Sequence, residues 1–376
     1  MLKDSEMARD THTPPAASAG PPLPYPTGWF AIACSGEIPP GRVLTRTFMN
    51  EEVVLYRTRG GRLRAVQPHC PHLGAHLGHG GTVKGEHLIC PFHRFAFATD
   101  GTCTATGYGT QPPRISLTAL PLHEVNDIVF IGYEQDGSAP AWQIPDLSGP
   151  PQRPYCRPVH HTFTLAGHPQ EVCENAVDSG HLAALHGFTV LQPPENDLVY
   201  HDTWFTYTMR VGRRVPLLGE VHLTPRIHVY GVSGIRADLP LPAGLGRLRM
   251  WVLPIATGPW HIEIRLPISA ALPALRFLPP ALRAPVGERL ARLLARLYKP
   301  LLKWDIGSDV PIWNHKRYID PPRLARGDGP IGTYRKWARQ FLSAPSGTPN
   351  SSQGEERLHR SSRPDQERLL NDQDHP

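Results

Sequence analysis

Short runs of apolar and β-branched residues, broken by glycines and other turn residues, recur through the first third of the chain. Such runs, rich in β-branched residues, lie at Val43–Phe48, Val53–Tyr56 and Leu63–Val66. Runs of this kind separated by glycine-containing turns predict short strands. The continuous apolar run Ile128–Tyr133 predicts a buried closing strand. The stretch from Trp29 to about Tyr133 is therefore expected to form a small all-β module.

From about His160 onward the pattern mixes the helical and the strand period. Strands are expected within residues 198–264, for example at Thr206–Val211, Ile227–Val232 and Leu248–Leu253. Helical character is expected at Pro169–Gly187, Val286–Leu302, Ser308–Ile312 and Gly332–Phe341. The second region therefore predicts an α+β arrangement, a sheet with packed helices.

These patterns divide the 376 residues into five segments. Polar, Pro-, Ala- or Ser-rich stretches predict a disordered leader over residues 1–26 and a disordered tail over residues 343–376. The β module is expected over residues 27–135 and the mixed region over 159–342. The Pro-rich segment 136–158 is expected to be a linker.

Composition narrows the class of protein. A hydrophobic content of 40% suits a folded core, and the net charge of +6 is compatible with nucleic acid, an anionic membrane or an acidic protein partner. Basic residues interleaved with aromatic ones do not cluster, so nucleic-acid binding is not expected. The N-terminus has no apolar targeting segment, and no apolar run is long enough to span a bilayer. We expect a soluble, cytoplasmic protein.

The six cysteines are too sparse for a disulfide scaffold, and two of them stand in a metal-ligand pattern. Cys70-Pro71-His72 is followed, seventeen residues later, by Cys90-Pro91-Phe92-His93. Two thiolates and two imidazoles bind zinc tetrahedrally. They also bind a [2Fe–2S] cluster in which two histidines replace two cysteines on one iron. The glycine-rich first loop and the strand-like Glu86–Ile89 between the loops favour the cluster.

The segment CPHLG…CPFH closely resembles the motif of the Rieske family. Respiratory Rieske proteins carry an extra cysteine in each loop, where this chain has Ala75 and Phe92, so the resemblance is to the oxygenase and ferredoxin branch. Phe95 stands where oxygenases often have tryptophan. Cys103 is expected to pack as a small apolar residue. The remaining histidines of this stretch are expected to be loop-bonded or solvent-facing: His69, His76, His79 and His87.

A second candidate metal site lies in Glu171–Gly187. On a helix, Asp178 and His181 share a face, whereas His181 and His186 stand roughly 140° apart. The two histidines can reach one ion only if the last turn loosens, which Gly180 and Gly187 favour. Two histidines and a distant carboxylate form the facial triad of non-haem iron oxygenases. Alone the motif is weak, because most histidine pairs on helices are surface residues.

Following a Rieske motif, ENAVDSGHLAALH resembles the iron motif of Rieske oxygenase catalytic domains. Asp309, in S-D-V-P-I-W-N, resembles the family's carboxylate ligand and is preferred to Asp305 as the third ligand beside His181 and His186. The resemblance also implies that Asp178 bridges His93 of one subunit to His181 of the next, within a homotrimer. Two further polar residues serve either as hydrogen-bonding supports or as a plain polar helix start, namely Glu174 and Asn175.

The stretch from Asp309 to Phe341 resembles the 3-ketosteroid 9α-hydroxylase and cholesterol 7-desaturase branch. That resemblance implies an N-terminal all-β Rieske domain and a helix-grip-like catalytic domain, with an antiparallel sheet and packed helices. The implied cofactors are one [2Fe–2S] cluster and one mononuclear Fe(II). The implied activity is a monooxygenase that uses O2 to hydroxylate or desaturate a bulky apolar substrate, a sterol or steroid. The sequence does not choose between these two outcomes.

Three alternatives stay open. One is an oxygenase of the same type acting on an aromatic or secondary-metabolite substrate, and the others are a Rieske electron carrier and a zinc-binding interaction protein. The chain lacks a G-x-G-x-x-G after a strand and a plant-type C-x4-C-x2-C, so a separate NAD(P)H-dependent reductase or a ferredoxin is the expected partner. The basic helix Val286–Leu302 is expected either to pack on the core with snorkelling arginines or to approach a membrane.

Overall fold

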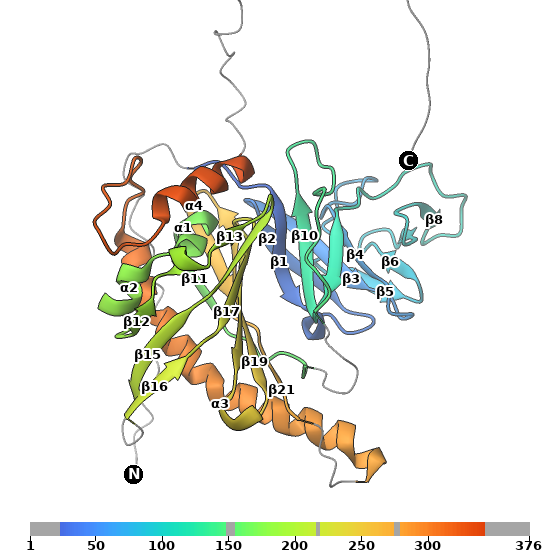
Figure 1. The fold of residues 1–376 in the computed structure, drawn as a ribbon. Coiled ribbons are helices and arrows are strands. Elements are labelled where there is room, and N and C mark those ends of the chain that lie inside the picture. The colour runs from blue at the N-terminus through green and yellow to red at the C-terminus, as the bar shows by residue number, and fades with distance from the viewer. Residues whose placement is uncertain (1–22, 148–154, 216–218, 274–278, 343–376) are drawn as a thin grey trace, which may run out of the picture. The chain divides into compact units, whose positions relative to one another are not determined.

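A computed structural model describes residues 23–147, 155–215, 219–273 and 279–342 of the chain (Figure 1). The predicted tail 343–376 and most of the predicted leader lie outside these residues. Residues 23–26, which the sequence assigns to the leader, are part of the fold. Pro26 pairs with Leu342, and the carbonyl oxygen of Pro24 lies 3.1 Å from His168 Nε2.

The N-terminal module consists, within the described residues, of small antiparallel sheets. The first has the order β1-β10-β9, with β1 at Gly28–Cys34, β10 at Ile128–Tyr133 and β9 at Leu122–Val125. The second has the order β2-β3-β4, with strands at Val43–Phe48, Glu51–Arg57 and Leu63–Val66. The third, β5-β6-β7-β8, has strands at Thr82–Lys84, His87–Ile89, Ala96–Phe97 and Cys103–Ala105. The predicted strands of this module are confirmed.

The C-terminal region is built on an antiparallel sheet in the order β11-β20-β19-β18-β17-β14-β13, with β21 paired to β19. Its strands are β11 (Thr162–Ala166), β13 (Val199–Tyr200), β14 (Trp204–Thr208), β17 (Arg226–Tyr230), β18 (Gly234–Pro240), β19 (Arg247–Gly258), β20 (His261–Arg265) and β21 (Ile268–Ala271). A smaller sheet holds β12 (Thr189–Gln192), β15 (Arg210–Val215) and β16 (Gly219–Leu223). The predicted α+β class is confirmed.

The helices of the C-terminal region differ from the prediction in where they begin and end. The described helices are α1 (Pro169–Glu174), α2 (Ser179–Ala184), α3 (Pro280–His315) and α4 (Ile331–Ala338), with short 3-10 turns at Ser35–Glu37, Pro194–Asn196, Pro242–Gly244 and Arg339–Phe341. The stretch 169–187, for which helical character was predicted, forms two short helices, because the chain leaves the helix between α1 and α2. The two helices predicted between 286 and 312 are one 36-residue helix.

The long helix α3 covers the main sheet and continues through three internal prolines, at 285, 300 and 311 (Figure 1). Its buried side chains include Ala291, Ala295 and Leu302, which pack in one cluster with apolar residues of β19 and β20. This packing stabilises helical backbone at positions where proline removes a backbone donor. Because α3 is continuous, it extends from its exposed N-terminal half to the buried Asp309.

The strand predicted at Thr206–Val211 is also wrong as a single element. It divides at Met209, whose backbone N–H donates to the carbonyl oxygen of Pro225 at 2.9 Å. β14 lies in the main sheet and β15 in the smaller one. Among the described residues, no helix is both long and apolar enough to cross a bilayer.

Candidate metal centres

Two short loops of the N-terminal module hold the Cys-His pairs. In the first loop, the backbone N–H of Cys70 donates to Ala75 O and that of Gly74 donates to Cys70 O, both at 2.9 Å. In the second, the backbone N–H of Cys90 donates to Phe95 O at 2.9 Å. Gly74 has φ +74°, a conformation that favours glycine. Both loops are thus closed by their own backbone hydrogen bonds, with each cysteine at the base.

The four predicted cluster ligands lie together. The rings of His72 and His93 have centroids 4.9 Å apart, and Cys70 and Cys90 are each 2% exposed. Burial raises the pKa of the Cys70 thiol to about 11, and the adjacent Cys90 adds to the rise. His93 Nδ1 is buried without a hydrogen-bond partner in the described part of the chain. A metal cluster fits these residues, because it supplies positive charge to two close thiols and a partner to the orphaned imidazole nitrogen.

The surroundings of this site are aromatic. Phe95, which stands at the position where the resemblance predicts tryptophan, stacks on the ring of His72 with centroids 4.3 Å apart. Cys103 is buried in the apolar cluster beneath the loops, as the sequence predicts. Leu73 and Phe92 are exposed next to the histidines.

The second predicted site begins at the break between α1 and α2. Asp178 is the N-cap of α2, and its Oδ1 accepts from the backbone N–H of His181 at 3.0 Å. The helix ends at Ala184, and Gly187 has φ +66°, so His186 lies beyond the last helical turn. This departure from helical geometry brings the rings of His181 and His186 to a centroid distance of 5.1 Å.

The hydrogen bonds of the two histidines leave the same nitrogen available on each. His181 Nδ1 lies 2.7 Å from the backbone oxygen of Asp178 and donates to it. Ser308 Oγ donates to Asp305 O at 2.6 Å and can therefore accept from His186 Nδ1, which lies 3.3 Å away. A bond at Nδ1 that fixes the tautomer leaves Nε2 free as a metal ligand. The ring of His181 is thus oriented by the backbone oxygen of Asp178, whose carboxylate caps the helix instead.

Asp309 completes this group from α3. Ligand atoms of His181, His186 and Asp309 all lie within 4.8 Å of one another, and His186 Nε2 is 3.5 Å from Asp309 Oδ1. Asp309 is only 4% exposed. Asp305, one turn earlier, makes a two-pronged ion pair with Arg213 at 2.9 and 3.0 Å. The structure therefore joins Asp309, and not Asp305, to the two histidines.

The charges of this group favour a bound cation. Burial lowers the pKa of His181, but Asp178 and Asp309 outweigh it, and the net pKa is raised. For Asp178, burial raises the pKa, yet the bonds from His181 leave it lowered overall. A nearly buried carboxylate between imidazoles is stable when a cation shares the site. A divalent metal fits this donor set of two histidines and one carboxylate.

Two further groups of possible ligands in the described residues are poor metal sites. In one, Glu37 already accepts from the Cys34 backbone and from Arg46 and Arg265, and burial raises the pKa of Cys34 to about 12. In the other, His76 Nδ1 accepts from Gly78 N–H at 3.1 Å. The Nε2 proton of neutral His76 then faces the nearby Glu52, so this nitrogen has no free lone pair.

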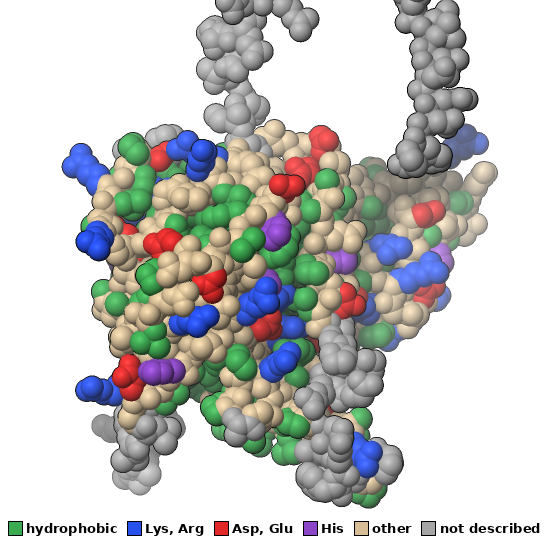
Figure 2. Space-filling view, in the orientation of Figure 1, with side chains coloured by type: hydrophobic (Ala, Val, Ile, Leu, Met, Phe, Trp, Pro, Cys, Tyr) green, Lys and Arg blue, Asp and Glu red, His purple; other side chains and the backbone are tan. Residues whose placement is uncertain are grey.

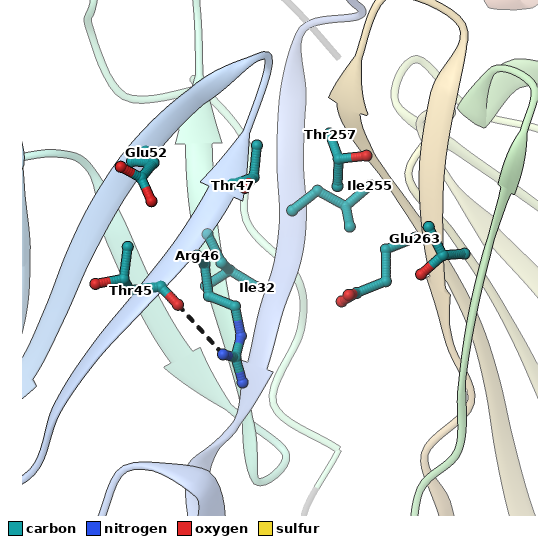
Figure 3. A pocket seen from close by; sticks show the side chains of 9 residues that line it. Ile32, Thr45, Arg46, Thr47, Glu52, Ile255, Thr257 and Glu263 are labelled. Atoms are coloured by element: carbon teal, nitrogen blue, oxygen red, sulfur yellow. Dashed lines mark hydrogen bonds between the residues drawn. The ribbon is translucent and has the colours of Figure 1, made fainter. Parts of the chain in front are cut away.

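A pocket of about 170 Å³ opens onto the second site. Its wall combines the three grouped residues with apolar side chains and two polar ones, namely Val172, Asn175, Ala176, Leu182, Phe188, Ile235, Val252, Asp305, Ile306 and Trp313. A larger cavity, of about 430 Å³, lies between strands of the N-terminal module and of the main sheet (Figure 3). Arg46 and Glu263 extend into it, and none of the predicted metal ligands lines it. The smaller pocket is therefore the candidate substrate site.

Several supporting residues were not identified from the sequence as parts of this site. Ser308 contacts His186, and Arg213 holds Asp305 while its guanidinium lies 4.8 Å from the centroid of the Phe188 ring. Arg335 of α4 donates to both carboxylate oxygens of Glu174 at 2.6 and 2.9 Å. The sequence offers one usable signal, since Ser308 directly precedes Asp309. The other contacts join residues far apart in the chain.

Comparison with known families agrees with this geometry. Residues 28–116 match the family model of the Rieske [2Fe-2S] domain. Residues 131–242 and 266–342 match that of the 3-ketosteroid 9alpha-hydroxylase C-terminal domain. Together the two matches extend over both regions described above.

Related proteins align with most of the chain. Cholesterol 7-desaturase of Bombyx mori is 32% identical over 334 residues, which cover 86% of this chain and 70% of that protein. The oxygenase component of 3-ketosteroid-9-alpha-monooxygenase from Rhodococcus rhodochrous is 24% identical, covering 85% and 84%. Among solved structures, dicamba monooxygenase bound to dicamba matches with a TM-score of 0.56 at 16% identity, covering 84% of this chain and 96% of that one.

A Rieske [2Fe-2S] domain followed by this C-terminal domain defines a Rieske oxygenase. Within that class, the chain belongs to the family of the 3-ketosteroid 9α-hydroxylases and cholesterol 7-desaturases. The class predicted from the two motifs and the branch predicted from the stretch Asp309 to Phe341 are confirmed.

Proposed function

We propose that this chain is a terminal oxygenase that uses O2, and electrons from a separate reductase, to hydroxylate or desaturate a sterol or steroid. The observation that carries the proposal is the buried group of His181, His186 and Asp309 in a chain that also has a Rieske domain. The substrate class is supported by the relatives, which are named for cholesterol and for 3-ketosteroids.

We assign Cys70, His72, Cys90 and His93 to the cluster. The mononuclear iron is assigned to His181, His186 and Asp309, and, when bound, it supplies the centre at which O2 reacts after electrons arrive from the cluster. The protein's own part is to hold these ligands in place. The Asp178 backbone oxygen and Ser308 Oγ each fix one imidazole tautomer.

The walls of the pocket select the substrate and exclude water. Val172, Leu182, Ile235 and Val252 offer a hydrocarbon surface that suits a rigid apolar molecule. The pocket volume of about 170 Å³ is below the several hundred Å³ usual for small-molecule sites. Side chains at its edge must therefore move to admit a steroid.

We infer that the Arg213–Asp305 pair is the part that moves. Asp305 lines the pocket, and Arg213 connects it to Phe188, which also lines the pocket. Both partners of the pair are only partly buried, with side-chain exposures of 17% and 16%. When the pair separates, each charged group can therefore still be solvated by water. This arrangement supports a gate at the edge of the substrate site.

We also propose a homotrimer, in which Asp178 links the cluster of one subunit to the iron of the next. Support comes from the Asp178 side chain, which caps α2 and remains 26% exposed to solvent, where a neighbouring subunit can reach it. The electron source is proposed to be an NAD(P)H-dependent reductase or a ferredoxin, since the Rhodococcus rhodochrous relative is named as an oxygenase component. A cytoplasmic location stays a prediction.

A single turnover tests the proposed reaction. The purified protein is reduced chemically without air, mixed with sterols and 3-ketosteroids, exposed to O2 and analysed by mass spectrometry. Gain of one oxygen identifies a hydroxylase, and loss of two hydrogens identifies a desaturase. An unchanged substrate mixture, from protein with a reducible cluster and bound iron, would contradict the steroid assignment.

A further inference from the structure

Between residues 290 and 304, α3 exposes large apolar side chains on one face. Leu290, Leu293, Leu297, Leu301 and Trp304 are 43%, 49%, 70%, 40% and 59% exposed. At 100° per residue they span an arc of about 80° on the helix. Figure 2 shows hydrophobic side chains at the surface in the lower part of the view, where Figure 1 draws α3. We call these five residues the leucine face.

The leucine face is separate from the face of α3 that packs on the sheet. Ala291, Ala295 and Leu302, which are buried in the core cluster, point about 140° away from the centre of the leucine face. The exposed face therefore contributes nothing to the core of the described chain. A contiguous exposed apolar patch with no packing role marks a surface that binds something.

Basic residues accompany the leucine face on one side. Arg289, Arg292, Arg296, Lys299 and Lys303 occupy an adjacent arc of about 80°. Between residues 280 and 304 the helix has one acidic residue, Glu288, which accepts from the backbone N–H of Arg157 at 3.0 Å. Apolar and basic arcs side by side on one helix match an anionic bilayer surface, which offers hydrocarbon beneath negative headgroups.

We propose that the leucine face of α3 lies on an anionic lipid membrane. A symmetric dimer through this face is a poorer occupant, because two such helices would bring their basic arcs together. Trp304, at the C-terminal end of the leucine face, also suits the bilayer interface, where aromatic rings gather. The helix lies in the plane of the surface, with its buried face toward the protein.

The position of Trp304 connects this surface to the substrate pocket. The next two residues, Asp305 and Ile306, line the pocket, and the guanidinium of Arg213 lies 5.4 Å from the centroid of the Trp304 ring. The membrane surface thus adjoins the gate, and an apolar substrate can enter from the bilayer. This second part rests on the proposed function, whereas membrane binding itself does not.

Vesicle flotation of the cofactor-loaded full chain tests the binding. Vesicles contain phosphatidylcholine alone or with phosphatidylglycerol added. The wild-type protein is expected to float with the anionic vesicles, less so at high salt. The variant Leu293→Gln/Leu297→Gln/Leu301→Gln is expected to bind roughly 100-fold more weakly, since three leucines no longer enter the bilayer. A control, Leu191→Gln/Val199→Gln, changes residues of similar exposure on other elements, 47% and 50%, and should float like the wild type.

The same variants separate this proposal from the proposed function. Substrate held in the vesicles should be converted at least roughly tenfold more slowly by the triple variant, whereas substrate dissolved with cyclodextrin should be converted equally. If no steroid is converted in either form but flotation behaves as expected, membrane binding stands and the substrate assignment falls. The proposal is overturned if the wild type does not float, if the triple variant floats equally well, or if that variant alters only the oligomeric state on a sizing column.

Discussion

The buried ion pair between Glu174 and Arg335 provides a test that depends on packing alone. Arg335 bonds both carboxylate oxygens of Glu174, and the side chains are 8% and 9% exposed. The pair ties α1 to α4, and α1 leads directly into Asp178 and the α2 helix that holds His181. Its loss should therefore destabilise the protein and loosen the iron site.

We expect Arg335→Met to lower the free energy of unfolding by about 3–5 kcal/mol, because it leaves a buried carboxylate without its partner. A domain of 150–250 residues loses about 2–4 °C of melting temperature per kcal/mol, so we expect a drop of roughly 6 °C or more. Removing both charges, in Glu174→Leu/Arg335→Met, should restore most of the loss, since well-packed apolar pairs often replace buried ion pairs.

Thermal unfolding followed by circular dichroism, at one pH and with cofactors loaded, measures the effect. The matched control is Arg339→Met, just beyond α4. Its side chain is 68% exposed and lies 3.7 Å from Asp320, so its loss should cost at most about 1 kcal/mol. If Arg335→Met melts within about 2 °C of this control, the reasoning on the buried pair is refuted.

Three further predictions concern the site and its supports. Ser308→Ala should weaken binding of the mononuclear iron roughly 10- to 100-fold while the cluster absorption stays unchanged, because the His186 tautomer loses its acceptor; an equal loss of both metals in a titration would contradict this. Burial lowers the pKa of His168 to about 4 in the folded chain, whereas an unfolded histidine has a pKa of about 6.5. As the pH falls below about 6.5, His168 is therefore protonated in the unfolded chain but not in the folded one. The free energy of unfolding should drop by roughly 2–3 kcal/mol by about pH 4.5. In urea unfolding, His168→Asn, which keeps a side-chain acceptor for the helix start, should lack this share of the drop; identical pH curves for both proteins would show that His168 does not titrate this way. Asp178→Ala, and Asp178→Asn with its cap retained, should keep both metals yet fail to couple cluster reduction to product formation, and normal turnover by either variant would refute the bridge.

The sequence predicts the N-terminal module well because its signals are local. The strands β2, β4 and β10 begin and end at the predicted residues, because short apolar or β-branched runs between turn residues mark them. The four predicted cluster ligands likewise lie in two short loops, Cys70 and His72 in one and Cys90 and His93 in the other. Hydrogen bonds between neighbouring backbone groups close each loop. Local patterns of this kind need no knowledge of distant contacts.

The helices were harder to predict because tertiary packing overrides local signals. Asp178 stands in a stretch of helical composition, yet α1 ends at Glu174 and Asp178 is the N-cap of the next helix. Helical character was expected on either side of residues 303–307, but α3 continues through this gap while it packs on the main sheet. In each case, local propensity is outweighed by burial against a surface that the sequence does not reveal.

The residues of the iron site also divide into those that local sequence signals predict and those that depend on tertiary packing. His181 and His186 are near neighbours in the chain, and their pairing could be predicted once a loosened turn was allowed. Arg213 bonds Asp305 across 92 residues, and Arg335 bonds Glu174 across 161. Such long-range partners depend on the completed fold, so no spacing rule finds them.

The measurement that tests the account most directly is the iron content of Asp309→Asn beside Asp305→Asn. We expect about three irons per chain in the wild type, two from the cluster and one from the mononuclear site. Asp309→Asn should retain about two, with the cluster spectrum unchanged, and Asp305→Asn should retain about three. Three irons in Asp309→Asn, or zinc in place of iron in the wild type, would contradict the assignment of this chain's two metal centres.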